Sequence, residues 1–299
     1  MRTDAGGRDQ DGIAALRAGD EVDTVLACTR KDRLLTRTGS PYLALELRDR
    51  TGALTARAFR GADALAGRFE RGELVRVRGR LERFRDQLVL EVADIRRLDG
   101  SEPVDPARFL PVAYRDLDEL EGFLEHLCAE VYDRGYRSLL SALLEDRELR
   151  GAWRRAPCTR SGHHCYIGGL LEHTVAVATL AQEACQLHPG INADLLLTAA
   201  ICHDLGRTGE FTYGAEFGLT DEGRLLGHLA IGQRIITSKA RSLDDGRRLA
   251  LMHCVLAHHG PGSLPGGRFQ SVEALALHRL NALDAGVKGA LEHGLGAGD

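Results

Sequence analysis

The sequence predicts a two-domain protein in which a small all-β barrel is followed by an all-α bundle. Between residues 20 and 99, apolar and polar residues alternate with a period of two, which is the pattern of half-buried strands. From residue 116 onward, apolar residues recur at a spacing of three and four, which is the pattern of amphipathic helices. With 299 residues and 43% hydrophobic content, the chain has enough apolar material for two cores.

The strand region consists of five short runs separated by turn-forming residues, such as Thr38-Gly39-Ser40-Pro41. The runs cover 21–30, 42–50, 54–60, 73–84 and 87–98. A short helix is expected in 61–72, between the third and fourth runs. Five strands with a helix in that place are the pattern of an OB-fold, a Greek-key barrel that binds oligonucleotides on one face. A small barrel with a structural role is the open alternative.

Basic residues are concentrated in this barrel segment. Residues 20–99 contain 17 Arg and Lys against 14 Asp and Glu, so the segment carries +3 while the whole chain carries −4. Alternate residues of a strand share a face, so the arginines of the fourth run predict a basic stripe along which a nucleic-acid backbone binds, with aromatic rings for base stacking. The expected nucleic-acid-binding residues are Arg76, Arg78, Arg80, Arg83, Arg85, Tyr42 and Phe59, and Phe84 is a further aromatic candidate.

A Pro-containing connector leads from the barrel into segments with helical periodicity, and no further strand is expected. Asn192 and Ser271 are the expected N-caps of two of the helices. The expected helical segments are 116–132, 136–146, 147–155, 168–188, 192–206, 223–240, 245–260 and 271–286. The expected domain boundaries are 1–17 for a disordered N-terminus, 18–102 for the barrel, 103–115 for the linker and 116–299 for the bundle.

Histidines and aspartates occur within apolar stretches of five different predicted helices or their ends. Buried polar groups need partners, and one metal ion satisfies several of them at once. Mixed imidazole and carboxylate ligation suits Mn²⁺, Fe²⁺, Co²⁺, Ni²⁺ or Zn²⁺. The candidate ligands are His173, His203, Asp204, His228, His258, His259 and Asp284. Cys165, beside two histidines, is a weaker zinc candidate, because seven scattered cysteines are typical of reduced thiols in the cytosol.

The order H…HD…H…H…D resembles the HD superfamily of metal-dependent phosphohydrolases. The segments "HHCYIGGLLEHTVAVA", "AAICHDLGRTGE", "LLGHLAIG", "LAHHG" and "EALALHRLNALDA" together resemble the YhaM-type 3′–5′ exoribonucleases, which are cytoplasmic bacterial enzymes with an OB-fold before an HD domain. The resemblance covers about residues 15 to 295, and its specific motifs lie between 163 and 284. The chain departs from the family pattern at Arg207, where the family usually has lysine.

The resemblance implies two divalent ions that share Asp204 as a bridge. The expected ligands of the first ion are His173, His203, Asp204 and Asp284, and those of the second are Asp204, His228 and His258. His259 is expected either to ligate the second ion or to hydrogen-bond phosphate. Mn²⁺ is the expected metal, with Co²⁺, Fe²⁺, Ni²⁺ and Zn²⁺ as alternatives. The residues expected to act in catalysis are Asp204, Arg207, His163 and His164, although a merely polar loop is an equal alternative for the last two.

The implied activity is hydrolysis of single-stranded RNA from the 3′ end to nucleoside 5′-monophosphates in the cytoplasm. Single-stranded DNA is compatible with the same attack, which needs no 2′-hydroxyl. Two other classes stay open: an HD hydrolase of small nucleotides, which would give the basic barrel no role, and a non-catalytic nucleic-acid-binding protein. No stretch reaches the ~20 apolar residues of a membrane span, and no membrane partner is expected. The sequence carries no signal for a particular oligomeric state.

Overall fold

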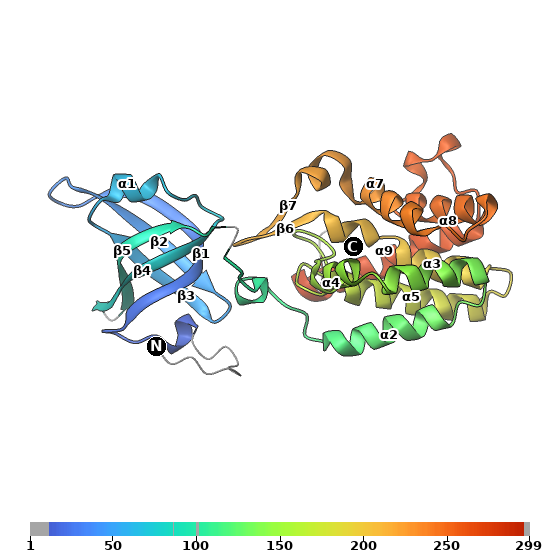
Figure 1. Ribbon diagram of the computed structural model, residues 1–299, viewed down its shortest axis with the longest axis horizontal. Coiled ribbons are helices and arrows are strands. Elements are labelled where there is room, and N and C mark those ends of the chain that lie inside the picture. The colour runs from blue at the N-terminus through green and yellow to red at the C-terminus, as the bar shows by residue number, and fades with distance from the viewer. Residues whose placement is uncertain (1–11, 86, 100–101, 296–299) are drawn as a thin grey trace. The chain divides into compact units, whose positions relative to one another are not determined.

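The computed structural model describes residues 12–85, 87–99 and 102–295. The chain divides into two compact units (Figure 1). One contains the described residues up to Pro111 together with Tyr213–Phe217, and the other contains Val112–Thr212 and the described residues from Gly218 onward. The two units correspond to the predicted β and α parts of the chain.

The first unit is a closed five-stranded barrel, which confirms the predicted OB-fold. Its strands are β1 (Glu21–Leu35), β2 (Pro41–Asp49), β3 (Gly52–Ala58), β4 (Leu74–Phe84) and β5 (Gln87–Arg97), and helix α1 (Ala62–Ala66) lies between β3 and β4. The barrel order is β1-β2-β3-β5-β4. The β3–β5 pair is parallel, and the other four neighbouring pairs are antiparallel. Strand β1 continues five residues beyond the predicted end at residue 30, because the whole 31–35 segment pairs with β2.

The alternating pattern places one face of each strand in the barrel core. On β4, positions 75, 77, 79 and 81 are buried, and Arg76, Arg78 and Arg80 between them point outward. Gly79 continues this buried series, and the register with β5 shifts between Arg78 and Gly79. A Cβ atom at Gly79 would lie 2.2 Å from the carbonyl oxygen of Glu91, so this closure of the barrel requires glycine.

The second unit is a helical bundle, as predicted. Its helices are α2 (Leu117–Ala129), α3 (Arg134–Leu144), α4 (Arg147–Arg155), α5 (Gly169–Leu187), α6 (Ala193–Cys202), α7 (Asp221–Lys239), α8 (Asp245–Ala257) and α9 (Val272–His293). Both predicted N-caps are confirmed, because the side chain of Asn192 accepts from the amide of Leu195 and that of Ser271 accepts from the amide of Ala274.

The expectation of no strand after the barrel is wrong. A two-stranded sheet of β6 (Phe211–Tyr213) and β7 (Phe217–Leu219) lies between α6 and α7. Each strand has three residues, which is too short for the alternation of apolar and polar residues to be visible in the sequence. The helix predicted over 192–206 also ends earlier, at Cys202.

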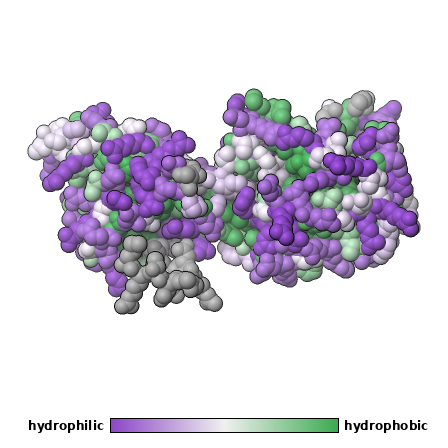
Figure 2. Space-filling model, in the orientation of Figure 1, coloured by the Kyte–Doolittle hydropathy of each residue, from purple (hydrophilic) through white to green (hydrophobic). Residues whose placement is uncertain are grey.

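The helical unit has one large apolar core, to which α5 contributes Leu170, Val177 and Ala181, and α6 contributes Leu196 and Ala200. Hydrophilic residues cover most of the face drawn in Figure 2. No helix in the described part of the chain is long and apolar enough to cross a membrane. The core holds the ends of α5, α6 and α8 together, and these are the ends that carry the predicted ligands.

Candidate metal centre

Asp204 lies at the centre of the predicted ligand set, directly after the C-terminal end of α6. Its side chain is 3% exposed, and His203 beside it is equally buried. The next residues form a tight 3-10 turn, Leu205–Gly209. At Gly206 a Cβ atom would lie 1.9 Å from the carbonyl oxygen of His228, so only glycine lets this turn pack against α7.

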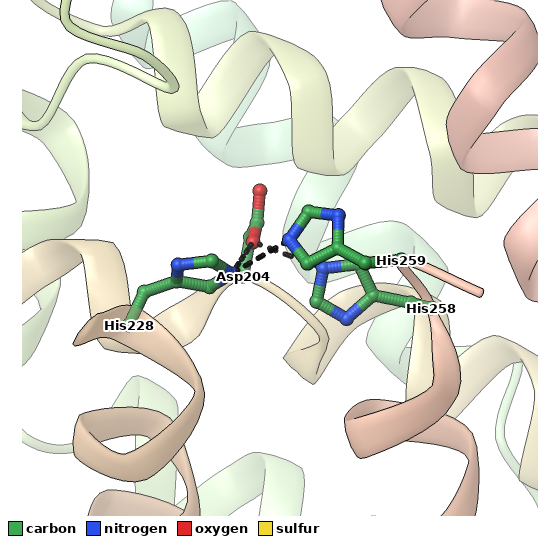
Figure 3. Close-up of side chains that lie close together, drawn as sticks. All are labelled: Asp204, His228, His258 and His259. Carbon is green, nitrogen blue, oxygen red and sulfur yellow. Dashed lines mark hydrogen bonds and ion pairs between the residues drawn. The ribbon is translucent and has the colours of Figure 1, made fainter. Parts of the chain in front are cut away.

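One carboxylate oxygen of Asp204 faces histidines of α7 and α8. Oδ1 lies 3.3 Å from Nε2 of His228 and 3.4 Å from Nε2 of His258. His259 completes this group, with its Nε2 atom 2.9 Å from that of His228 (Figure 3). Gly227 adopts a left-handed conformation with φ of 70° inside α7, and this break in the helix precedes His228 directly. The structure therefore brings together the three residues predicted for the second ion and His259, whose ligation stays a prediction.

The other carboxylate oxygen of Asp204 faces α5 and the end of α6. Oδ2 lies 3.9 Å from Nε2 of both His173 and His203. The side chain of Arg207 also reaches this oxygen and donates to it from Nε at 2.8 Å. The two oxygens of Asp204 thus face two different sets of imidazole nitrogens, which is the arrangement of a bridging carboxylate.

Hydrogen bonds fix the orientation of three of these imidazoles. Nδ1 of His203 donates to the carbonyl oxygen of Ala200, and Nδ1 of His258 donates to that of Val255, each at 2.7 Å. A ring that donates from Nδ1 presents the lone pair of Nε2, and both Nε2 atoms point toward Asp204. Nδ1 of His173 is held in the same way by the carboxylate of Asp284, at 2.6 Å.

Asp284 lies on the far side of His173 from Asp204. Its Oδ2 atom accepts from Nδ1 of His173 and lies 3.0 Å from Nε2 of His164. The structure therefore groups Asp284 with His164 and His173, and it places His203 and Asp204 in a separate group with His173. In this geometry Asp284 orients the His173 ring, while its direct ligation of an ion stays a prediction.

Asp204 is ionised despite its burial. Burial opposes ionisation of Asp204, but the guanidinium of Arg207 and the nearby imidazoles outweigh it and hold the pKa of Asp204 well below its ordinary value. Burial also lowers the pKa of His203 well below its usual range and lowers that of His163 to about 4. These two rings are neutral at neutral pH, which is the form that binds metal.

Four neighbours of the centre were not among the predicted site residues. Glu210 accepts from Arg207 at 3.1 Å and lies 3.7 Å from Nδ1 of His228. Asn281 contacts Nε2 of His173 at 3.0 Å, and Tyr166 contacts Nδ1 of His164 at 2.7 Å. Spacing offered a signal for the first two, because each lies three residues from a predicted site residue of its own segment.

Cys158 is the fourth neighbour, and no local pattern marks it. Its thiol donates to Oδ2 of Asp204 at 3.6 Å. Cys158 also forms a group with His163 and His173 that could hold a metal ion. Cys165, the weaker zinc candidate, instead donates to the carbonyl oxygen of Arg160 at 2.9 Å. Cys165 belongs to none of the groups of described residues that could hold a metal ion.

The residues of the centre fit a divalent metal ion. Oδ1 of Asp204 and Nε2 of His258 are buried and have no hydrogen-bond partner among the described residues. A buried polar atom without a partner is costly, and a cation placed between the carboxylate and the imidazoles would satisfy both atoms. The centre is therefore a cluster of His and Asp side chains able to bind a divalent metal.

The predicted arginine stripe of the barrel lies on the outer face of β4, where Arg76, Arg78 and Arg80 point outward. These arginines pair with acids of the neighbouring strand β1. Arg76 and Arg78 contact Asp23 at 3.0 and 2.9 Å, and Arg80 lies 3.9 Å from Glu21. Arg83 and Arg85 follow near the end of the strand and do not continue the alternation, since position 82 is a glutamate.

Of the predicted stacking residues, Phe59 lies beside the arginine stripe, because it lines one pocket together with Arg80 and Glu21. The rings of Tyr42 and Phe59 stack with centroids 5.2 Å apart, on the outer side of β2 and just after β3. Phe84 is 47% exposed, and the guanidinium groups of Arg57 and Arg85 lie 4.8 and 5.4 Å from its ring centroid. This aromatic surface, defined by Tyr42, Phe59, Phe84 and Arg57, combines exposed rings with positive charge.

Comparisons with known proteins agree with this geometry. The family model of the HD domain matches residues 170–286, which contain all seven candidate ligand positions. The family model described as an OB-fold nucleic acid binding domain matches residues 25–98. The barrel thus matches an OB-fold nucleic acid binding domain, and the bundle matches an HD domain.

Several curated proteins are similar over nearly the whole chain. The 3′-5′ exoribonuclease YhaM of Shouchella clausii (strain KSM-K16) is 30% identical over 281 residues, which cover 92% of this chain and 86% of that protein. The proteins of the same name from Geobacillus sp. (strain WCH70) and Bacillus subtilis (strain 168) are 30% and 27% identical, and each alignment covers 92% of this chain and 85% and 88% of the relative. The resemblance expected from the sequence is confirmed: the chain belongs to the YhaM family of 3′–5′ exoribonucleases.

Proposed function

We propose that this protein is a metal-dependent 3′–5′ exoribonuclease that hydrolyses single-stranded RNA to nucleoside 5′-monophosphates. The observation that carries the proposal is the position of Asp204 between two sets of imidazole nitrogens, with His228 and His258 on one oxygen and His173 and His203 on the other. A paired metal site of this kind activates water for attack on a phosphodiester and needs no nucleophilic side chain. The names of the relatives supply the direction of attack and the RNA substrate.

The proposed ligands divide between the two ions as the carboxylate oxygens do. His173 and His203 would hold the first ion, with Asp284 as the further predicted ligand, and His228 and His258 would hold the second. His259 either joins the second ion or binds phosphate. When bound, the two ions lower the pKa of a bound water and neutralise charge on the phosphoryl oxygens. We propose Mn²⁺ as the native metal, because oxygen and imidazole donors suit it.

The remaining side chains of the centre position the ligands and the substrate. Arg207 is 12% exposed and holds Asp204 and Glu210 together, and we propose that its guanidinium also stabilises charge on the phosphate. His164 fixes Asp284, and His163 lies next to His173, with ring centroids 5.3 Å apart. We propose that His163 and His164 contact the phosphate that is cleaved.

The barrel is proposed to bind the single strand whose 3′ end is hydrolysed. The aromatic surface offers rings for base stacking, and Arg57 offers charge for the backbone. Arg76, Arg78 and Arg80 are proposed to add backbone contacts, although each is already close to an acid. The proposed location is the cytoplasm, since the seven cysteines are unpaired thiols.

The test is hydrolysis of a 5′-labelled single-stranded RNA by the full chain in Mn²⁺. A ladder that shortens from the 3′ end and releases 5′-monophosphates supports the proposal, and it must be lost in Asp204→Asn and after chelation. Cleavage of small nucleotides alone would replace the proposal with the small-nucleotide hydrolase. A matched single-stranded DNA measures the preference for RNA directly.

A further inference from the structure

The turn between α4 and α5 brings a cysteine and a histidine to the edge of the metal centre. The amide of Cys158 donates to the carbonyl oxygen of His164 at 3.0 Å, which closes the chain segment between them. Within this segment, Thr159 donates from its hydroxyl to the carbonyl oxygen of His163 and accepts from the amide of Gly162, each at 2.8 Å. The backbone geometry of the turn is therefore fixed before any ligand binds.

His164 has a left-handed backbone conformation, with φ of 51°, at the end of this turn. Such a conformation is strained for a residue with a side chain, and here it is stabilised by the hydrogen bonds of His164 to Tyr166 and Asp284. A Cβ atom at Gly169, the first residue of α5, would lie 2.1 Å from the carbonyl oxygen of His164. The turn thus packs tightly on α5, the helix that carries His173.

The result is a compact group of three soft and borderline donors. The sulfur of Cys158 and one ring nitrogen each of His163 and His173 lie within 4.8 Å of one another. Cys158 and His173 are fully buried. Nδ1 of His163 is buried and has no hydrogen-bond partner among the described residues. This group has a sulfur ligand, which the Asp204–His228–His258 group lacks.

We propose that Cys158, His163 and His173 form a thiolate site that selects Zn²⁺ over Mn²⁺ and makes zinc an inhibitor of this protein. Thiolate and imidazole ligation is typical of zinc, whereas carboxylate-rich sites suit manganese. His173 belongs both to this site and to the group with His203 and Asp204. An ion held by Cys158 and His163 therefore takes His173 away from the ion bridged by Asp204. On binding, the thiol proton of Cys158 passes to solvent and the sulfur becomes the ligand.

This inference deepens the proposed function at the same centre, but its main test needs no RNA. The metal-stripped full chain is titrated with Co²⁺, which reports sulfur ligation through a sulfur-to-cobalt charge-transfer band and imidazole or carboxylate ligation through weaker d–d bands. We expect the charge-transfer band in the parent protein and its loss in Cys158→Ala and Cys158→Ser. The matched control is Cys165→Ser, which changes a neighbouring thiol outside the group and should keep the band.

The second measurement is zinc inhibition of Mn²⁺-supported hydrolysis of a nitrophenyl phosphodiester, with each variant scored against its own activity without zinc. Cys158→Ala removes one ligand and should raise the zinc concentration for half-inhibition about tenfold or more. Cys165→Ser removes no ligand and should leave this concentration unchanged. Circular dichroism checks that each variant is folded.

The outcomes separate this inference from the proposed function. Cobalt binding with d–d bands but no charge-transfer band, or a band that persists in Cys158→Ser, overturns the thiolate site and leaves the metal centre intact. Absence of any cobalt binding contradicts the metal-dependent function itself.

Discussion

Oδ1 of Asp204 and Nε2 of His258 lie 3.4 Å apart, and both atoms are buried without a hydrogen-bond partner among the described residues. Arg207 pairs with the other oxygen of Asp204, so a cation between Oδ1 and Nε2 would bind the remaining carboxylate oxygen and accept the imidazole lone pair. Divalent metal should therefore stabilise the helical unit strongly. We expect Mn²⁺ to raise the melting temperature of the chelator-treated protein in a concentration-dependent way, as for any ligand that binds only the folded state.

The first substitution that tests this relationship is Asp204→Asn. The amide keeps the shape of the carboxylate but loses the charge that two ions would share, so hydrolysis should fall below detection. Calorimetric titration with Mn²⁺ should show fewer bound ions than in the parent chain. Circular dichroism should show an unchanged helical fold. Near-normal turnover by the folded variant would contradict a bridging role for Asp204.

Arg207 tests the charge balance on the other side of the centre. Arg207→Ala leaves Asp204 and Glu210 buried without their cation, so the ion-free protein should lose about 3–5 kcal/mol of unfolding free energy. Arg207→Lys should keep most of the activity, whereas Arg207→Ala should lose about tenfold or more, the scale of one charge-assisted contact.

Denaturant unfolding measured with and without Mn²⁺ separates the two roles of Arg207. Bound ions compensate Asp204, so the stability loss in Arg207→Ala should shrink in Mn²⁺ while the activity loss remains. Equal stability and activity of the alanine variant and the parent would assign Arg207 to a neutral role.

Gly206 tests the packing that places His228 at the centre. Gly206→Ala adds an atom that would overlap the carbonyl oxygen of His228, so α7 must move away from the turn. We expect a lower melting temperature and weaker binding of the second Mn²⁺ ion by titration. The matched control is Gly289→Ala in α9, where a Cβ atom meets nothing within 4 Å and should be neutral or stabilising. Normal Mn²⁺ affinity in Gly206→Ala would show that the close approach is dispensable.

The barrel offers a direct comparison between its rings and its arginines. Phe59→Ala should cost about 1–3 kcal/mol of affinity for single-stranded RNA, the scale of one stacked base. Changing Arg76, Arg78 and Arg80 together to Ala should flatten the salt dependence by about 0.7 per lost phosphate contact. Because these arginines pair with Asp23 and Glu21, we expect the triple variant to lose fewer than three phosphate contacts.

Binding measured at several salt concentrations decides between these two surfaces. An unchanged affinity in Phe59→Ala, with a large loss in the arginine variant, would show that the strand binds to the arginines of β4 and not to the stacked rings of Tyr42 and Phe59. Arg30→Ala is a suitable charge control, since this arginine pairs locally with Asp32.

The buried histidines predict how the ion-free protein responds to acid. The pKa of His163 is about 4 in the folded chain against 6.5 in the unfolded chain, and burial also lowers the pKa of His203 well below its usual range. Below pH 6.5 the unfolded chain therefore binds more protons than the folded chain. The contribution of these histidines to stability is complete above pH 6.5, and the free energy of unfolding decreases as the pH falls toward 4. One extra proton corresponds to a slope of about 1.4 kcal/mol per pH unit.

Denaturant unfolding in chelator across this pH range measures the slope. His163→Gln should make it shallower, because one group that differs between the two states has been removed. A free energy of unfolding that stays constant between pH 6.5 and 4 would contradict the neutral, buried state of these rings.

The sequence by itself determined the architecture and most of the metal centre. Period-two alternation is a local property, so the barrel strands and the order of barrel and bundle followed from it directly. The seven His and Asp candidates were visible because polar groups in apolar helices are costly without partners. Short elements were the exception: β6 and β7 have too few residues to show a period.

Only the tertiary structure decided which groups meet. Asp284 was expected beside His203 and Asp204, but α9 carries it to the Nδ1 side of His173 and next to His164. Cys158 reaches Asp204 from 46 residues away in the chain, through a turn closed by its own backbone. The charges of Arg76 and Arg78 are compensated by Asp23, because β1 and β4 pair in the register that sets them side by side. Such contacts depend on register and packing between distant segments, and no local pattern of residues encodes them.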